Sequence, residues 1–316
     1  MTERGKYETR LDPEYWAYVD RVNGWYPPEV LGQPIERQRE IYNAMCREFH
    51  AGYPAGVTAT DSLIADGDRP IAVRRYTLAG RQAKALILYF HGGGYVLGGL
   101  DSHDDICAEL CAGTGYAVMS VDYRLSPEHR HPAAFNDALT AFRAVATTCS
   151  VPVVLCGESA GGNLAAAVAH ATRGDLCAPA GQVLVYPSLG GDQSNGSYVE
   201  HAQAPLLSVR DLAFYDQART GIAGVAADPT LAPLSDAVLS DLPPTVIVTA
   251  ECDPLSSDGE TYRDLINAAG GRAAWIEEQR LTHSFLRARK TVARAAEAFV
   301  HIVQAVDALG KSDWPY

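Results

Sequence analysis

VVLCGESAGG, residues 153–162, is the stretch of sequence that decides the fold of this chain. Its first four residues are apolar, which predicts a buried strand, and the alanine-rich run of residues 163–172 behind it predicts a helix. A strand, a sharp turn and a helix around Gly-x-Ser-x-Gly form a nucleophile elbow, with Ser159 at the tip of the turn. Gly157 and Gly161 keep Cβ atoms out of the closest approach of strand and helix. An ordinary glycine turn is the competing interpretation, and the flanking strand and helix argue against it.

Composition and charge narrow the class of protein. The 316 residues are 47% apolar and 20% charged, as in soluble globular domains. The net charge is −12 and no basic cluster occurs, which argues against nucleic acid and anionic membranes as partners. No apolar run approaches the ~20 residues of a membrane span. The charged residues 1–6 lack the following apolar core of a secretory signal.

The cysteines indicate a reducing compartment. There are seven, an odd number, scattered along the chain, and Cys156 and Cys252 fall in or beside predicted core strands. This pattern predicts reduced thiols in a cytoplasmic protein rather than a disulfide framework. Cys107 and Cys111 lie four positions apart on a predicted helix, but no second Cys or His pair completes a zinc site, so we expect no metal.

Strand and helix patterns alternate from about residue 57 onward. Apolar runs predict strands at Ile71–Leu78, Ala85–Phe90, Ala117–Val121, Val153–Cys156, Val183–Tyr186, Thr245–Thr249 and Ala273–Ile276. Helical patterns lie between and after them, at Asp101–Gly113, Ala133–Thr147, Ala160–Thr172, Asp258–Ala269 and Thr291–Leu309. This alternation predicts an α/β fold, with a mostly parallel, doubly wound sheet flanked by helices on both faces.

Two regions do not follow this alternation, and together they predict a helical cap. Residues 1–55 contain too few apolar positions for a core of their own, so their helices must lie on another part of the chain. Residues 188–242 are an insertion without a clear core strand, and an excursion of this length is usually functional. The catalytic domain is then expected to comprise residues 56–187 and 243–316. The predicted cap helices are Pro13–Asn23, Ile35–Phe49 and Val209–Thr220.

A serine hydroxyl is a weak nucleophile until a base takes its proton, and a third group must orient that base. Functional groups gather at the carboxyl ends of the strands in a doubly wound sheet, and this architecture has the chain order serine, acid, histidine. Of nine histidines, five precede Ser159. His170 and His301 lie on predicted helices, and His201 lies in the predicted cap. His283, in the loop after the last strand, is therefore the predicted base.

The acid is expected just after the strand Thr245–Thr249. Asp253 is the predicted residue, in a turn whose geometry Pro254 fixes. Glu251 and Asp258 are competitors for the same role, and an Asp-Pro pair is also an ordinary turn former. The serine, acid and histidine together, in this order and at strand ends, are more specific than any one of them alone.

The glycine run 92–94 predicts an oxyanion hole. It directly follows the strand Ala85–Phe90, and glycines let the backbone approach a substrate and aim its amides at it. The amides of Gly92, Gly93 and Ala160 are the predicted donors, and His91 is expected to position the loop. A phosphate cradle is the alternative, but neither Gly-Lys-Ser/Thr nor Gly-x-Gly-x-x-Gly follows the run.

Substrate-binding residues are harder to predict, because apolar cap residues serve packing as readily as binding. The candidates lie beside the two glycine motifs and in the insertion: Tyr95, Glu158, Leu206, Leu207 and Phe214, with Tyr215 and the aromatic residues of segment 7–26 behind them. The absence of a membrane-binding stripe favours small soluble esters. No metal or organic cofactor is expected.

Several motifs resemble the hormone-sensitive-lipase-like (bacterial family IV) branch of the α/β-hydrolases. They are His91-Gly92-Gly93-Gly94, Gly157-Glu158-Ser159-Ala160-Gly161-Gly162, Asp253-Pro254-Leu255, His283-Ser284-Phe285 and the segment Asp122–His129. The similarity runs from about Leu86 to the C-terminus and is weaker in the N-terminal helices. It implies a carboxylesterase of short acyl chains, with a cap and with a homodimer formed through the sheet edge.

Two details qualify the resemblance. Family members commonly continue the acid motif with Arg-Asp-Glu, whereas Ser256-Ser257-Asp258 stands here, which puts the local hydrogen bonds around Asp253 in doubt. In the segment Asp122–His129, the resemblance implies that Arg124 and Glu128 form a structural ion pair near the oxyanion loop.

The predicted function is therefore a serine carboxylesterase that hydrolyses short-to-medium acyl esters through an acyl-enzyme. Amide or carbamate hydrolysis with the same triad is an alternative that the motifs do not separate from it. A ligand-binding receptor on a hydrolase fold is a further alternative, but such a receptor would be expected to lack one of the three triad residues.

Overall fold

The computed structural model describes residues 4–65, 69–222 and 227–316. They contain an eight-stranded sheet with the strand order β1-β2-β4-β3-β5-β6-β7-β8. The strands from β3 to β8 run parallel, whereas β2 pairs antiparallel with both β1 and β4. The predicted mostly parallel sheet is thus confirmed. The strands are β1 (Val57–Ile64), β2 (Ile71–Leu78), β3 (Leu86–Phe90), β4 (Ala117–Val121), β5 (Val153–Glu158), β6 (Gly181–Val185), β7 (Thr245–Cys252) and β8 (Ala273–Thr282).

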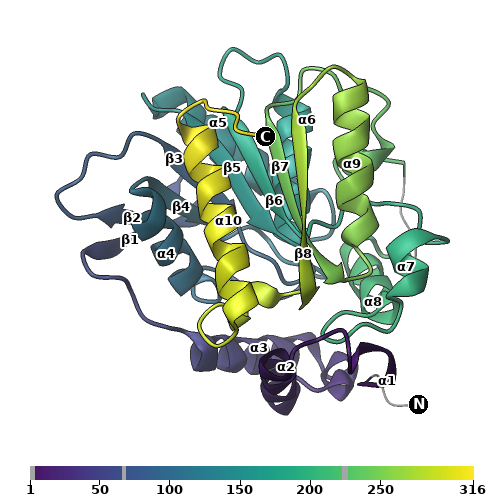
Figure 1. Cartoon of the computed structure of the whole chain (residues 1–316). Coiled ribbons are helices and arrows are strands. Elements are labelled where there is room, and N and C mark those ends of the chain that lie inside the picture. The colour runs from purple at the N-terminus through teal and green to yellow at the C-terminus, as the bar shows by residue number, and fades with distance from the viewer. Residues whose placement is uncertain (1–3, 66–68, 223–226) are drawn as a thin grey trace.

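Helices cover both faces of the sheet (Figure 1). One face carries α4 (Asp104–Thr114) and α10 (Ala293–Gly310), and the other carries α5 (Ala133–Thr148), α6 (Ala160–Thr172) and α9 (Ser256–Ala268). These five bounds agree with the sequence prediction to within a few residues, because each helix has a strong apolar face or an alanine-rich run.

Two apolar cores lie on the two faces, because successive side chains of a strand point to opposite sides. Ile87 and Val154 belong to the core under α4 and α10. Their neighbours Leu88 and Leu155 belong to the core under α5, α6 and α9. All four side chains are fully buried. The central strands are therefore apolar on both sides, and this makes them recognisable as continuous apolar runs in the sequence.

The strand β1 is absent from the strands that the sequence predicts. Its sequence, VTATDSLI, has five exposed residues and no continuous apolar run, so the pattern of a core strand is missing. It pairs with β2 along its whole length at the edge of the sheet. The last strand, β8, also continues beyond its predicted end at Ile276 and reaches Thr282, next to His283.

The helices of segment 1–55 and of segment 188–242 gather at one end of the sheet, where the parallel strands reach their carboxyl ends (Figure 1). They are α1 (Arg4–Tyr7), α2 (Pro13–Trp25), the 3-10 turn η1 (Pro28–Gly32), α3 (Ile35–Phe49), α7 (Gly196–Glu200), α8 (Val209–Thr220) and the 3-10 turn η2 (Pro233–Ser235). Among the described residues, no helix is both long enough and apolar enough to cross a membrane.

Tyrosines of α2 tie this helical layer to the sheet. The Tyr15 hydroxyl lies 2.9 Å from Thr282 Oγ1 at the end of β8, and the Tyr18 hydroxyl donates to the Ser284 carbonyl at 2.9 Å. Both tyrosines are buried. Since Thr282 and Ser284 flank His283, the N-terminal helices hold the loop that carries this histidine.

Candidate active site

Ser159 lies on a strained turn between β5 and α6. Its backbone has φ 55° and ψ −119°, a conformation that residues with a side chain rarely adopt. The turn is tight because its two glycines touch backbone: a Cβ on Gly157 would lie 2.2 Å from the Gly161 carbonyl oxygen, and one on Gly161 would lie 2.0 Å from that of Phe90. The elbow geometry therefore requires glycine at both positions, and it presents the Ser159 hydroxyl at the carboxyl end of the sheet.

His283 connects Ser159 to Asp253. Its Nε2 lies 2.9 Å from Ser159 Oγ, and its Nδ1 lies 2.7 Å from Asp253 Oδ2. An ionised carboxylate only accepts hydrogen bonds, so Nδ1 carries the proton and Nε2 is left to accept from the serine hydroxyl. Asp253 is fully buried, and its other oxygen accepts from the Leu255 amide at 2.9 Å. The structure thus brings the three predicted triad residues together.

The two competing carboxylates have other partners. Glu251 accepts from the Arg280 amide at 2.7 Å. Asp258 accepts from the Leu189 amide at 2.8 Å and from the Tyr198 hydroxyl at 3.1 Å. Neither is bonded to His283, so Asp253 is the acid that geometry selects.

The segment that departs from the family pattern is well bonded. The Ser257 hydroxyl accepts from the Ser197 amide at 2.8 Å, and the Ser197 hydroxyl donates to the Pro254 carbonyl at 2.6 Å. Burial raises the pKa of Asp258 to about 7, although its hydrogen-bond donors oppose the shift. These contacts fasten the start of α9 to α7, so the departure leaves the turn at Asp253 supported.

The prediction that the Gly92 amide forms the oxyanion hole is wrong. This amide donates to Glu158 Oε1 at 2.6 Å, which leaves it unable to face a substrate. Gly93, Gly94 and Ala160 line the cavity at Ser159 instead. Gly94 has φ 60°, and a Cβ there would lie 2.2 Å from the Tyr215 ring, so this position requires glycine. Of the glycine run, Gly93 and Gly94 are therefore the residues that lie at the cavity wall.

Glu158 is one of the predicted substrate-binding residues. It lines the cavity, but its carboxylate holds the glycine run in place. Its carboxylate accepts from Gly92 and lies 2.7 Å from His103 Nε2. Burial alone would raise the pKa of Glu158, but His103, the Tyr186 hydroxyl and the Arg287 charge lower it to about 2. Glu158 is therefore ionised at neutral pH and holds the loop against β5.

His91 has the positioning role that the sequence predicts. Its Nδ1 lies 2.7 Å from the Gly92 carbonyl oxygen, and its own carbonyl accepts from the Tyr123 hydroxyl at 2.7 Å. Its ring stacks on Tyr123 with 4.3 Å between centroids. Burial lowers the pKa of His91 to about 3, so the ring stays neutral in the folded protein.

We expect neutral His91 to contribute to the free energy of unfolding, and we expect this contribution to be lost below about pH 6.5. An unfolded chain protonates His91 as the pH falls through the ordinary pKa of 6.5, whereas the folded chain does so only near pH 3. The stability due to neutral His91 is then complete above pH 6.5 and is lost between pH 6.5 and 3. His103, whose pKa burial also lowers, acts in the same direction. Asp258, whose pKa burial raises to about 7, acts in the opposite direction between about pH 7 and pH 3.8. Melting temperatures measured from about pH 8 to pH 4 test this expectation.

The variant His91→Gln is the control for this pH dependence. It is expected to melt at a lower temperature than the wild type at pH 8, because the contacts with Gly92 and Tyr123 change. Its melting temperature should then depend less on pH, because residue 91 no longer titrates. An equally steep curve in the variant would show that His91 does not cause the acid sensitivity.

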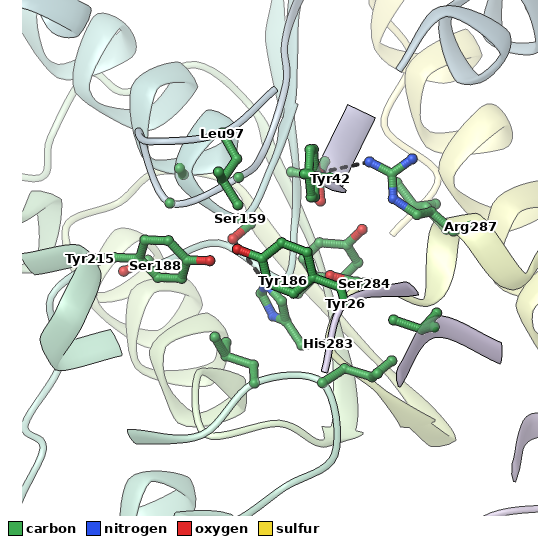
Figure 2. A pocket seen from close by; sticks show the side chains of 18 of the residues that line it. Tyr26, Tyr42, Leu97, Ser159, Tyr186, Ser188, Tyr215, His283, Ser284 and Arg287 are labelled. Carbon is green, nitrogen blue, oxygen red and sulfur yellow. Dashed lines mark hydrogen bonds between the residues drawn. The ribbon is translucent and has the colours of Figure 1, made fainter. Parts of the chain in front are cut away.

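A cavity of about 120 Å³ lies at Ser159. Figure 2 shows the aromatic residues around it. Of the predicted substrate residues, Tyr95, Glu158, Leu206 and Leu207 line it. Phe214 is not among its lining residues, because on α8 the neighbouring Tyr215 faces the cavity instead. Further residues that the sequence does not predict also line it, among them Met45, Leu97, Tyr42 and Arg287.

Arg124 and Glu128 do not form the ion pair that the resemblance implies. Arg124 Nη2 lies 2.6 Å from Asp137 Oδ1 on α5. Glu128 Oε2 lies 2.8 Å from Arg39 Nη2 on α3, whose Nε also donates to the Val96 carbonyl at 2.8 Å. The Arg39–Glu128 pair therefore joins the N-terminal helices to the loop that follows the glycine run.

Within the described part of the chain, no group of three or more His, Cys, Asp or Glu side chains is arranged to hold a metal ion. All seven cysteines are free, and Cys107 and Cys111 are buried in the core under α4 and α10.

Comparisons with known proteins agree with this geometry. A family model described as the alpha/beta hydrolase fold matches residues 87–287. The chain is 39% identical over 241 residues to Esterase LipI of Mycobacterium tuberculosis, covering 72% of this chain and 75% of the relative. It is 34% identical over 232 residues to ethyl acetate hydrolase of Pseudomonas putida, covering 71% and 73%. The crystal structure of a hyperthermophilic esterase from Pyrobaculum calidifontis superposes with a TM-score of 0.87 at 30% identity, covering 95% of this chain and 99% of the other.

Proposed function

Because the chain belongs to the α/β-hydrolase fold family, in its hormone-sensitive-lipase-like branch, we propose that it is a serine carboxylesterase. Its substrates are esters of short to medium acyl chains. The observation that carries this proposal is the hydrogen-bonded series Asp253–His283–Ser159 at the wall of a cavity. The relatives described above are named as ester hydrolases, and this favours esters over amides, carbamates or a receptor role.

The proposed reaction has two halves. His283 Nε2 takes the Ser159 proton as Oγ attacks the ester carbonyl, and it returns that proton to the leaving alcohol. Water then repeats the sequence on the acyl-enzyme and releases the acid. Asp253 holds the Nδ1 proton toward itself and stabilises the imidazolium that forms in each half. The reaction uses no metal ion or organic cofactor.

The oxyanion that forms at the carbonyl is stabilised by the amides of Gly93, Gly94 and Ala160. Ala160 is the first residue of α6, so its amide also benefits from the positive end of the helix dipole. Glu158 contributes indirectly, since its bond to the Gly92 amide sets the path of the glycine run.

Residues 1–55 and 188–242 act as the cap, and residues 56–187 and 243–316 form the catalytic domain. Tyr18 and Tyr42 from the first segment, and Leu206 and Leu207 from the second, line the cavity at Ser159. The cap therefore sets the length of acyl chain that the cavity accepts.

Hydrolysis of p-nitrophenyl esters from acetate to laurate tests this function. We expect kcat/KM to be highest for chains of two to about eight carbons, because the cavity volume of about 120 Å³ limits longer chains. The rate on laurate should be at least about tenfold lower. Undiminished turnover of long chains would contradict the proposed cap, and no turnover of any ester would contradict the function.

Two finer expectations concern assembly and location. Among the described strands, the edge strand β8 pairs with β7 alone, which leaves its outer side available for pairing with β8 of a second copy in a homodimer. The free cysteines, five of them buried, suit the reducing cytoplasm. Sedimentation of the purified protein distinguishes a monomer from the dimer.

A further inference from the structure

Arg287 introduces a positive charge into the wall of the cavity that holds Ser159. It lies on the 3-10 turn η3 (Phe285–Ala288), four residues after His283, and it is 8% exposed. Its guanidinium is protonated at every physiological pH. Figure 2 shows it on one side of the cavity, bonded to Tyr42, with Tyr215 on the opposite side.

The partners of this guanidinium are neutral. Nη1 donates to the Ser102 carbonyl at 3.0 Å, and Nη2 lies 2.8 Å from the Tyr42 hydroxyl and 3.2 Å from His103 Nε2. No carboxylate among the described residues forms an ion pair with it. Arg289, two residues further along the chain, is by contrast paired with carboxylates: its Nη2 lies 2.5 Å from Asp105 and 2.8 Å from Glu109. Arg287 differs from Arg289 in having no carboxylate of the described residues bonded to it directly, and the same holds for the buried Arg219, whose partners are carbonyl and amide oxygens. Burying a cation without such a contact is costly.

Of the two other carboxyl groups in the cavity wall, Glu158 attracts Arg287 electrostatically but is not bonded to it. Glu158 is separated from it by His103, and the Glu158 carboxylate already accepts from the Gly92 amide. Asp216 follows Tyr215 on α8 and also lines the cavity, and burial raises the pKa of Asp216. The guanidinium therefore has no directly bonded carboxylate among the described residues, and it can still donate hydrogen bonds to an anion inside the cavity.

We propose that the cavity binds esters carrying a second, ionised carboxylate, which Arg287 and the Tyr42 hydroxyl receive while Ser159 attacks the ester carbonyl. A guanidinium presents its N–H groups in a fork that matches a carboxylate, and such bonds are strong where water is excluded. This inference rests on the proposed esterase function. The carboxylate belongs either to the acyl part, as in half-esters of dicarboxylic acids, or to the alcohol part, as in acyl esters of hydroxy acids.

Two matched pairs of substrates distinguish these sources. Mono-p-nitrophenyl glutarate and its methyl ester differ only in an acyl-side charge, and 4-acetoxybutyrate and its methyl ester differ only in an alcohol-side charge. For each pair, the quantity to measure is the ratio of kcat/KM for the anionic substrate to that for the neutral one. In Arg287→Met we expect this ratio to fall by about 10- to 100-fold for at least one pair, mainly through KM. Arg143→Met, which removes an exposed charge on α5, is the control and should leave both ratios unchanged.

Unchanged ratios in Arg287→Met for both pairs would overturn the inference. If that variant does not fold, competitive inhibition of the wild-type protein tests the inference instead. Pentanoate should inhibit at least about tenfold more strongly than pentanamide, and equal inhibition would overturn the inference. Failure of the esterase function is a separate result, because the neutral esters would then not be hydrolysed at Ser159 at all.

Discussion

Replacement of Ser159 by alanine is expected to lower kcat for ester hydrolysis by roughly 10⁴–10⁶. The variant loses the nucleophile, so no acyl-enzyme forms, and the oxyanion hole then assists only the slow attack of water. His283→Ala should cost about as much, because the serine hydroxyl is then without its base. Rates on p-nitrophenyl butyrate, measured beside circular dichroism spectra of each variant, check both expectations.

Ser188→Ala is the matched control for Ser159→Ala. Ser188 lines the same cavity, but its hydroxyl is not bonded to His283. Its loss should lower kcat/KM by less than about tenfold. If Ser159→Ala folded normally and kept a rate within tenfold of the wild type, the chemistry would lie at another residue.

Replacement of Asp253 by asparagine is expected to lower kcat by roughly 10³–10⁴. Asp253 accepts the Nδ1 proton of His283 at 2.7 Å, and this fixes Nε2 as the acceptor for the serine hydroxyl. An asparagine amide group can donate to Nδ1 instead, which favours the tautomer with the proton on Nε2, and that tautomer cannot act as the base. Steady-state kinetics on a short-chain ester measure the loss.

Asp258→Asn is the control for this second variant. Asp258 is also a buried carboxyl of the same segment, but it accepts from backbone amides and from Tyr198 rather than from His283. An asparagine oxygen can keep the amide bonds, so kcat should stay within about tenfold of the wild type. Equal losses in both variants would mean that Asp253 supports the turn and does not orient the base.

The parts of the fold and site that the sequence predicts are those with strong local patterns. β5 and the elbow follow from the ten residues 153–162, because Gly157 and Gly161 are each required by a backbone contact, and α6 follows from the alanine-rich run behind them. The triad partners follow from the rule that functional groups lie at strand ends. The edge strand β1 was missed because an exposed edge needs no apolar run to be stable in the sheet.

The predictions that fail at the site concern residues whose role depends on side chains distant in the sequence. Gly92, Gly93 and Gly94 are consecutive glycines, so the sequence does not distinguish their amides. The Gly92 amide donates to the Glu158 carboxylate, 66 residues away, and therefore does not face the substrate. Phe214 and Tyr215 are adjacent on α8, and the docking of that helix decides which of them meets the cavity. Arg287 gave no signal in the sequence, since its burial depends on α3 and on the loop before α4 closing over it.

The central claim is that Ser159 forms a covalent intermediate with an acyl group, and a phosphate ester that traps this nucleophile tests it most directly. Diethyl p-nitrophenyl phosphate should release one equivalent of p-nitrophenolate and leave one diethylphosphoryl group per chain, on the peptide that contains Ser159. Ser159→Ala should remain unlabelled. A label on a different residue, or full activity after stoichiometric labelling of Ser159, would contradict the account.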